Sequence, residues 1–155
     1  MNAAAISIPV RGGDRLADAV RAGIASLAVV FVNAGASIVT NRFTQIGGTQ
    51  PKNIGWGVGT TTAAVGQTAL VTESAPTTAG GRTVGTESIT TVTQTNDNYR
   101  VVGTVTAGST LAITEAGLFD NVTAGNMLIR ADFAAVNVVS GDSIAFTFGL
   151  KFIPG

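Results

Sequence analysis

The fold is decided by the stretch Ser143-Ile144-Ala145-Phe146-Thr147-Phe148-Gly149-Leu150-Lys151-Phe152, close to the end of the chain. Apolar side chains recur there at every second residue, with small or polar side chains between them. Successive side chains of a β-strand point to opposite faces of its sheet, so this alternation places the apolar residues on one face. The sequence therefore predicts a final strand that faces the core with Ile144, Phe146, Phe148, Leu150 and Phe152.

Further strands are predicted upstream at residues 40–46, 52–59, 82–95, 99–107, 110–119 and 127–138. Residues 66–81 are rich in threonine, alanine, glycine and proline, which predicts a loop with a short strand near residues 70–73. Asn96-Asp97-Asn98 has the residue types of a tight turn, because these side chains tolerate left-handed backbone angles. The pattern predicts a mainly β chain, folded as an antiparallel β-sandwich or a jelly-roll-like barrel.

The N-terminal part has a different character. Residues 1–13 combine small side chains with Pro9 and two glycines, which favours an extended arm. Asp14 is a suitable N-cap for a helix, and apolar residues follow at three- to four-residue spacing up to a stop at Gly35. Residues 29–32 are rich in β-branched side chains, which favour strands. An extended conformation is therefore the alternative for the second half of this segment. We expect an arm and helix at residues 1–36 and a β-sandwich domain at residues 37–155.

Charged residues make up 12% of the chain, about half of the usual share in soluble globular proteins. Much of the surface is therefore expected to face protein rather than water. Nine acidic and nine basic residues cancel, so no overall field attracts nucleic acid or anionic lipid. Arginine outnumbers lysine, and arginine is enriched at protein interfaces while lysine is depleted.

Cysteine and histidine are both absent. This excludes disulfides, thiolate or imidazole metal sites, and the histidine proton transfers on which many enzymes depend. The uncharged stretch at residues 22–41 turns polar after Val32, which makes it too short for a bilayer helix, and no basic leader precedes it. We expect a protein made in a cytoplasm, without membrane contact, cofactor, metal or enzymatic activity.

The glycine-rich stretch at residues 54–61 is a candidate phosphate-binding loop. Such a stretch can cradle phosphate, but this one lacks the Gly-Lys-Ser/Thr ending of a phosphate loop. The preferred interpretation is a strand in which Gly57 and Gly59 let another backbone or a ring approach closely, with Trp56 as an apolar anchor.

Glu115 stands inside an apolar strand, where an unpaired carboxylate is costly to bury. A raised pKa there would suit acid catalysis, yet no second carboxylate lies at informative spacing. We expect Glu115 to pair with an arginine such as Arg130 or Arg100, or with backbone N–H groups across a subunit contact.

Oxygen-bearing side chains that are candidate calcium ligands also occur, at Asp120, Asn121, Asp132 and Asp142. Their spacing matches no calcium loop, so turn capping is the preferred role. In the arm and helix, apolar and basic side chains are expected to contact a neighbouring protein. These are Ile6, Ile8, Pro9, Arg11, Arg15, Leu16, Val20 and Arg21.

A series of motifs runs from residue 53 to the C-terminus: Asn53-Ile54-Gly55-Trp56-Gly57-Val58-Gly59, Asn98-Tyr99-Arg100-Val101-Val102-Gly103-Thr104, Thr114-Glu115-Ala116-Gly117-Leu118-Phe119-Asp120, Leu128-Ile129-Arg130-Ala131-Asp132-Phe133 and Gly141-Asp142-Ser143. In this order the motifs resemble a diffuse family of bacteriophage virion structural proteins. The resemblance implies an oligomeric β-sandwich that coats capsids or contributes to tails and fibres. It also implies that Glu115, Gly117, Arg130 and Gly141 are fold-defining positions. We assign structural roles to these and to Trp56, Gly57, Gly59, Phe119, Phe133 and Asp142.

The leading hypothesis is a capsid cement or decoration protein on the outer surface of the virion, synthesised in the host cytoplasm. Its expected partners are the major capsid protein and further copies of itself, as a dimer or trimer. The runner-up is a tail, neck or fibre-base component. A carbohydrate-binding module is a weaker hypothesis, because Trp56 and Tyr99 are the evident aromatic candidates. An enzyme would need a paired-carboxylate cleft that the sequence gives no reason to expect.

Overall fold

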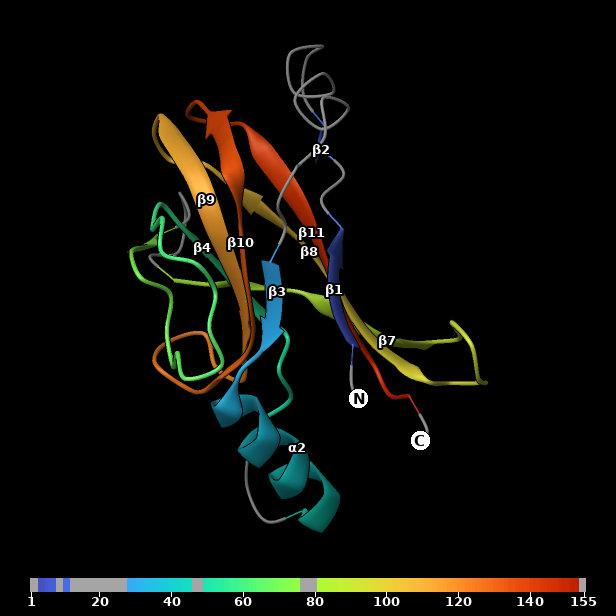
Figure 1. Cartoon of the computed structure of the whole chain (residues 1–155). Coiled ribbons are helices and arrows are strands. Elements are labelled where there is room, and N and C mark those ends of the chain that lie inside the picture. Colours follow the sequence, from blue (N-terminus) through green and yellow to red (C-terminus); the bar gives the residue numbers. More distant parts are fainter. Residues whose placement is uncertain (1–2, 8–9, 12–27, 46–48, 76–80, 154–155) are drawn as a thin grey trace.

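The computed structural model describes residues 3–7, 10–11, 28–45, 49–75 and 81–153. Within these ranges the chain is mainly β, and its antiparallel strands form two sheets that pack against each other (Figure 1). This confirms the predicted β-sandwich class. In the described part of the chain, no helix has the length and apolar character needed to cross a membrane.

Sheet I has the strand order β1 (Ala3–Ser7), β11 (Ser143–Lys151), β8 (Asn98–Thr106) and β7 (Thr86–Thr90), and β2 (Val10–Arg11) also pairs with β11. Sheet II has the order β3 (Ala28–Phe31), β10 (Met127–Val138), β9 (Leu111–Phe119), β4 (Asn53–Gly57) and β5 (Glu73–Ser74), and β6 (Thr83–Val84) also pairs with β4. Every pairing is antiparallel.

The core between the sheets depends on β11, as its alternation predicts. Ile144, Phe146, Phe148 and Leu150 are at most 2% exposed. The ring of Phe146 meets the Trp56 indole edge-on, with the ring centroids 6.4 Å apart, and stacks on Phe148. The prediction is wrong for the fifth apolar residue, because β11 ends at Lys151 and Phe152 is 37% exposed beyond the last paired residue.

The predicted strand at residues 82–95 is two strands that belong to different sheets. β6 pairs with β4 in sheet II, whereas β7 pairs with β8 in sheet I. The crossing point is Gly85, whose N–H donates to the carbonyl oxygen of Lys52 over 2.7 Å. A Cβ atom at Gly85 would lie 2.7 Å from the Val101 side chain, so only glycine lets the chain pass between the sheets here.

The helix predicted from the spacing of apolar residues between Asp14 and Gly35 is not found in the described part of that segment. Residues 28–31 form β3, so the extended alternative is confirmed for this segment, and residues 12–27 lie outside the described residues. The helix α2 (Asn33–Thr44) begins where a stop was expected and occupies the predicted strand at residues 40–46. Its N-cap Val32 makes no side-chain capping bond, and its sequence contains Gly35 and β-branched residues that are poor helix formers. Contacts with β10 therefore maintain it: Ile38 is buried, and Gly35 lies against the Leu128 backbone.

The N-terminal residues contribute strands to both sheets. β1 and β2 pair with β11, and β3 pairs with β10. The expected boundary between residues 36 and 37 falls inside α2. Figure 1 shows α2 projecting beyond one end of the sandwich.

Trp56 offers a test of the core. It is fully buried, and its indole Nε1 lacks a hydrogen-bond partner, alone among buried side-chain polar atoms of the described residues. An unpaired buried donor costs about 1–3 kcal/mol, so Trp56→Phe should lose apolar contact but also remove this cost. We predict that Trp56→Phe lowers the free energy of unfolding by less than about 2 kcal/mol and Trp56→Ala by about 3–5 kcal/mol. Urea denaturation measures both, and equal losses would contradict the account.

Candidate functional site

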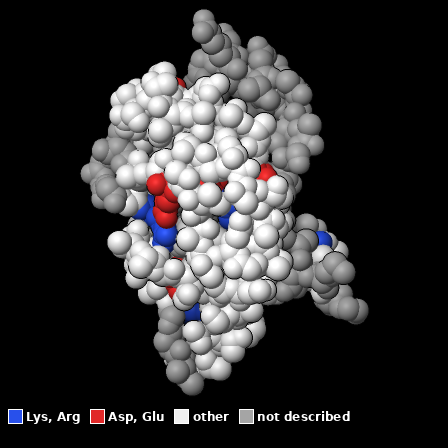
Figure 2. Space-filling model, turned by 60° about the vertical axis from the view of Figure 1, so that its left-hand side comes forward, with Lys and Arg blue, Asp and Glu red and all other residues white. Residues whose placement is uncertain are grey.

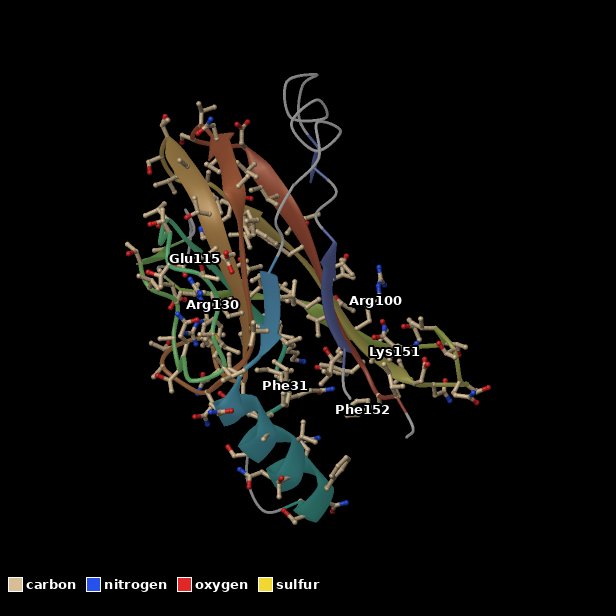
Figure 3. The ribbon with its side chains drawn as sticks, in the orientation of Figure 1. Phe31, Arg100, Glu115, Arg130, Lys151 and Phe152 are labelled. Atoms are coloured by element: carbon tan, nitrogen blue, oxygen red, sulfur yellow. The ribbon has the colours of Figure 1, made fainter. Side chains whose placement is uncertain are left out.

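The outer face of sheet II carries a buried ion pair. Arg130 of β10 donates to Oε2 of Glu115 of β9 from Nη2 over 2.8 Å and from Nε over 3.1 Å, and neither side chain is exposed. Figure 3 shows the two side chains turned toward each other, with Arg100 far from them on the strands of sheet I. Of the two arginines considered from the sequence, Arg130 is therefore the partner.

Glu115 also accepts three backbone N–H groups from residues 58–72, which we call the covering loop. Oε1 accepts from Gly59 over 3.2 Å and from Thr72 over 2.7 Å, and Oε2 accepts from Val71 over 3.0 Å. Burial by itself raises the pKa of the Glu115 carboxyl, but the Thr72 N–H, Arg130 and the Val71 N–H outweigh it and hold the pKa below its ordinary value. The carboxylate stays charged at neutral pH, which argues against a role as a general acid.

Arg130 is satisfied from the same loop. Its Nη1 donates to Gln67 over 2.9 Å and its Nη2 to the carbonyl oxygen of Thr61 over 2.8 Å. Asp132, two residues further along β10, accepts the N–H of Ala63 over 2.7 Å. The ion pair and its neighbours therefore fasten the covering loop to the sheet through charge-assisted hydrogen bonds.

Glycines of β4, β9 and the covering loop make room for this arrangement. A Cβ atom at Gly57 would overlap the carbonyl oxygen of Thr72 and lie 2.6 Å from Oε1 of Glu115. At Gly59 the same Oε1 would be 2.5 Å away, and at Gly117 the Phe119 ring would be 2.9 Å away. Gly57 thus lets the Thr72 backbone approach closely, as predicted, whereas Gly59 lies beyond the end of β4 and makes room for the Glu115 carboxylate.

Arg82 completes the outer layer. Its guanidinium lies 3.2 Å from the centroid of the Phe119 ring and donates to both carboxylate oxygens of Glu73, over 2.7 and 3.0 Å. A third nitrogen, Nη1, donates to the carbonyl oxygens of Asn121 and Ala124. Arg82 therefore joins β5 to the turn after β9.

Three further acidic side chains, Asp120, Asp142 and Asp97, cap turns. Asp120 accepts the N–H of Asn126 over 2.7 Å, and Asp142 accepts the N–H of Val139 over 2.9 Å, next to Gly141 with its left-handed φ of 92°. Asp97 accepts three N–H groups from the β7–β8 turn. Within the ranges that the structure describes, no group of three acidic side chains is close enough to hold a metal ion.

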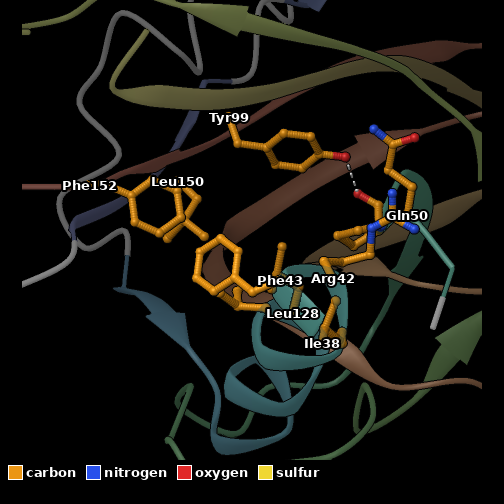
Figure 4. Close-up of a pocket in the computed structure, with 10 residues that line it drawn as sticks. Ile38, Arg42, Phe43, Gln50, Tyr99, Leu128, Leu150 and Phe152 are labelled. Atoms are coloured by element: carbon orange, nitrogen blue, oxygen red, sulfur yellow. Dashed lines mark hydrogen bonds between the residues drawn. The ribbon is translucent and has the colours of Figure 1, made fainter. Parts of the chain in front are cut away.

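The sequence did not indicate the groove at the end of the sandwich from which α2 projects, which we call the open-end groove. It has a volume of about 200 Å³ and is lined by Ile38, Val39, Arg42, Phe43, Gln50, Pro51, Tyr99, Leu128, Leu150 and Phe152. Figure 4 shows Phe43, Leu150 and Phe152 toward one end of it and Gln50 and Arg42 toward the other. This groove is the candidate functional site, because apolar side chains line it and no described element covers it.

Tyr99 supplies the hydroxyl group of the groove, and that group is already bonded. The Tyr99 hydroxyl donates to the carbonyl oxygen of Pro51 over 3.0 Å. Burial and the negative charge of Glu87 raise the pKa of Tyr99 to about 12, so the phenol remains neutral at physiological pH. The groove therefore offers apolar contact rather than chemistry.

The predicted structural and contact residues separate into two groups. Trp56 and Phe133 lie in the core, and the other residues assigned structural roles lie in the outer layer of sheet II or in turns. Ile6 and Arg11 belong to β1 and β2, where they pair with Phe148 and Ser143. The remaining contact candidates, Ile8, Pro9, Arg15, Leu16, Val20 and Arg21, lie outside the described residues.

Comparison of the chain with protein-family models, curated proteins and solved structures found no match in any of the three. Function is therefore inferred from the residues and their geometry.

The buried ion pair should be strongly coupled. We predict that Glu115→Gln or Arg130→Met alone lowers the free energy of unfolding by about 3–5 kcal/mol, because each leaves a buried charge unpaired. The double variant should lose less than the sum of the two. The half-exposed Lys52–Glu87 pair, at 3.3 Å, is the matched control, and Glu87→Gln should destabilise the protein much less than either single change at the buried pair. Additive losses in urea denaturation would show that the ion pair does not act as a unit.

The covering loop also provides a matched pair of glycines. Gly57→Ala should lower the free energy of unfolding by about 2 kcal/mol or more, since the new methyl group meets backbone that cannot move aside. Gly66→Ala, where nothing lies within 4 Å of the added atom, should be neutral or slightly stabilising. Thermal denaturation of both variants tests this, and a tolerated Gly57→Ala would mean that the loop does not pack as described.

Proposed function

We propose that this protein is a structural component of a bacteriophage particle, a cement protein that binds the outside of the major capsid shell and stabilises it. The observation that carries the proposal is the character of the surface. It is poor in charge and rich in exposed apolar side chains, which suits burial against other proteins.

Large apolar side chains reach solvent across both sheets, the turns and α2. Among the described residues these are Phe43, Val65, Val71, Val84, Ile89, Val92, Val122, Val139, Phe152 and Ile153. On the face drawn in Figure 2, uncharged residues cover nearly all of the described surface, and charged side chains form a few small groups. A single exposed apolar residue is ordinary, but many of them beside so little charge favour a protein that works inside an assembly.

A shell-coating role uses such a surface well. A subunit that touches several coat subunits makes several modest apolar contacts, and linkage between these contacts raises the total affinity by orders of magnitude. The sandwich supplies a rigid body for this purpose, because its loops are fastened by Arg130, Glu115 and Arg82. No chemistry is required for the shell to resist the pressure of packaged DNA.

The buried carboxylate supports the same conclusion. Glu115 is the fully buried acid of the described chain, and Arg130 and three N–H groups occupy its oxygens. A general acid or base must reach a substrate proton within hydrogen-bond distance, and a saturated carboxylate under a loop cannot do so. The residue that most resembles a catalytic group therefore serves the fold.

The proposal is tested on particles of the phage that encodes the chain. Particles assembled without the protein should release their DNA at a lower temperature, and adding the purified protein should restore the wild-type release temperature. An unrelated β-sandwich protein at equal concentration is the control. Failure to bind the shell, or binding that leaves the release temperature unchanged, would contradict a cement role, and binding confined to tails would favour a tail or neck component.

A further inference from the structure

The open-end groove exists because sheet I extends past the elements that cover it. Ile89 pairs with Tyr99, and Tyr99 with Leu150, so the three residues form a row across β7, β8 and β11 on the core-facing side. Leu150 is 2% exposed, whereas Ile89 at the other end of the row is 68% exposed. The apolar interior therefore continues beyond the point where sheet II and α2 cover it.

The size and polarity of the groove suit a protein side chain. Small-molecule pockets commonly have volumes of about 300–1,000 Å³, and this groove has about 200 Å³. The Tyr99 hydroxyl already donates to the carbonyl oxygen of Pro51, so it is not an anchor for a polar ligand. An apolar side chain is the occupant that this shape and lining favour, as in the anchor pockets of protein interfaces.

The same surface also carries a matching projection. Phe43 on α2 borders the groove and is 80% exposed, the largest exposure among the large apolar side chains of the described chain. A two-fold contact requires one patch that is complementary to itself, so that a projection and a recess lie side by side. Phe43 and the groove beside it meet this requirement.

The charges of the groove do not favour an acidic peptide as its occupant. Arg42 is the charged residue of the lining, no acidic side chain lines the groove, and Arg42 lies toward the end away from Phe152 (Figure 4). A groove built for an acidic peptide would be expected to gather several basic groups. A neutral, apolar partner surface fits better, and a second copy of this chain presents one.

We propose that the open-end groove is a two-fold self-association surface, in which Phe43 of each copy fills the groove of the other. Phe43 and Phe152, with 80% and 37% of their surface exposed, bring roughly 200–300 Å² of apolar area. A stable dimer buries about 800 Å² on each partner. The dimer is therefore weak in isolation and is favoured where copies are concentrated on an assembly.

Sedimentation equilibrium of the full chain from about 10 µM to 1 mM, a range that covers weak association, tests the inference. Wild type should form dimers, and Phe43→Ser should weaken the association by about tenfold or more. Val139→Ser is the matched control, because Val139 is also exposed but lies in the turn at the opposite end of β11, and it should leave association unchanged. A wild type that remains monomeric, or equal association of the two variants, would overturn the proposal.

Cross-linking separately tests whether Phe43 of one copy lies near Phe152 of the other. The chain contains no cysteine, so introduced cysteines have no competing thiols. Chains with Phe43→Cys and chains with Phe152→Cys are mixed under mild oxidation, and a disulfide between the two kinds of chain should form faster than one between Val139→Cys and Phe152→Cys chains. Equal rates would contradict the contact. Shell binding is measured apart from these experiments, so a monomer that still coats shells removes this inference and leaves the cement proposal intact.

Discussion

The contact on which the rest of the structure depends is the ion pair between Arg130 and Glu115 beneath the covering loop. Two charges without solvent exposure are costly unless every oxygen and N–H finds a partner, and here the loop backbone supplies those partners. The ion pair and the covering loop therefore depend on each other. The loop lies where it does because the charges need it, and the glycines at positions 57, 59 and 117 stand where side chains would separate loop from sheet.

The sequence predicted those parts of the fold whose cause is local. Alternation along β11 predicted the core face, and the cost of burying Glu115 predicted an arginine partner. The backbone N–H groups that Glu115 also accepts were expected across a subunit contact, but they come from the covering loop of the same chain. The helix α2 was missed because its sequence contains weak helix formers and its stability comes from Ile38 and Gly35 against β10. The predicted strand at residues 82–95 included Gly85, because a crossing between sheets depends on pairing with distant strands and leaves no periodic signal in the sequence.

The candidate site was hidden for the same reason. Phe43 stood in a predicted strand and Phe152 in the predicted core, and only the placement of α2 and the end of β11 bring both to one groove. The covering loop and the ion pair close the outer side of sheet II, whereas the end of the sandwich beside α2 is apolar and is left uncovered by the described residues. This division agrees with a building block that is rigid within itself and completes its apolar contacts with neighbouring proteins.

The copy number of this chain in purified particles tests the shell-coating role most directly. Quantitative mass spectrometry gives the number of copies relative to the major capsid protein. A shell-coating protein should be present at a ratio near one or at a simple fraction of it, because the repeating lattice of the coat sets the number of binding sites. A few copies per particle would contradict this role and assign the protein to the tail or neck.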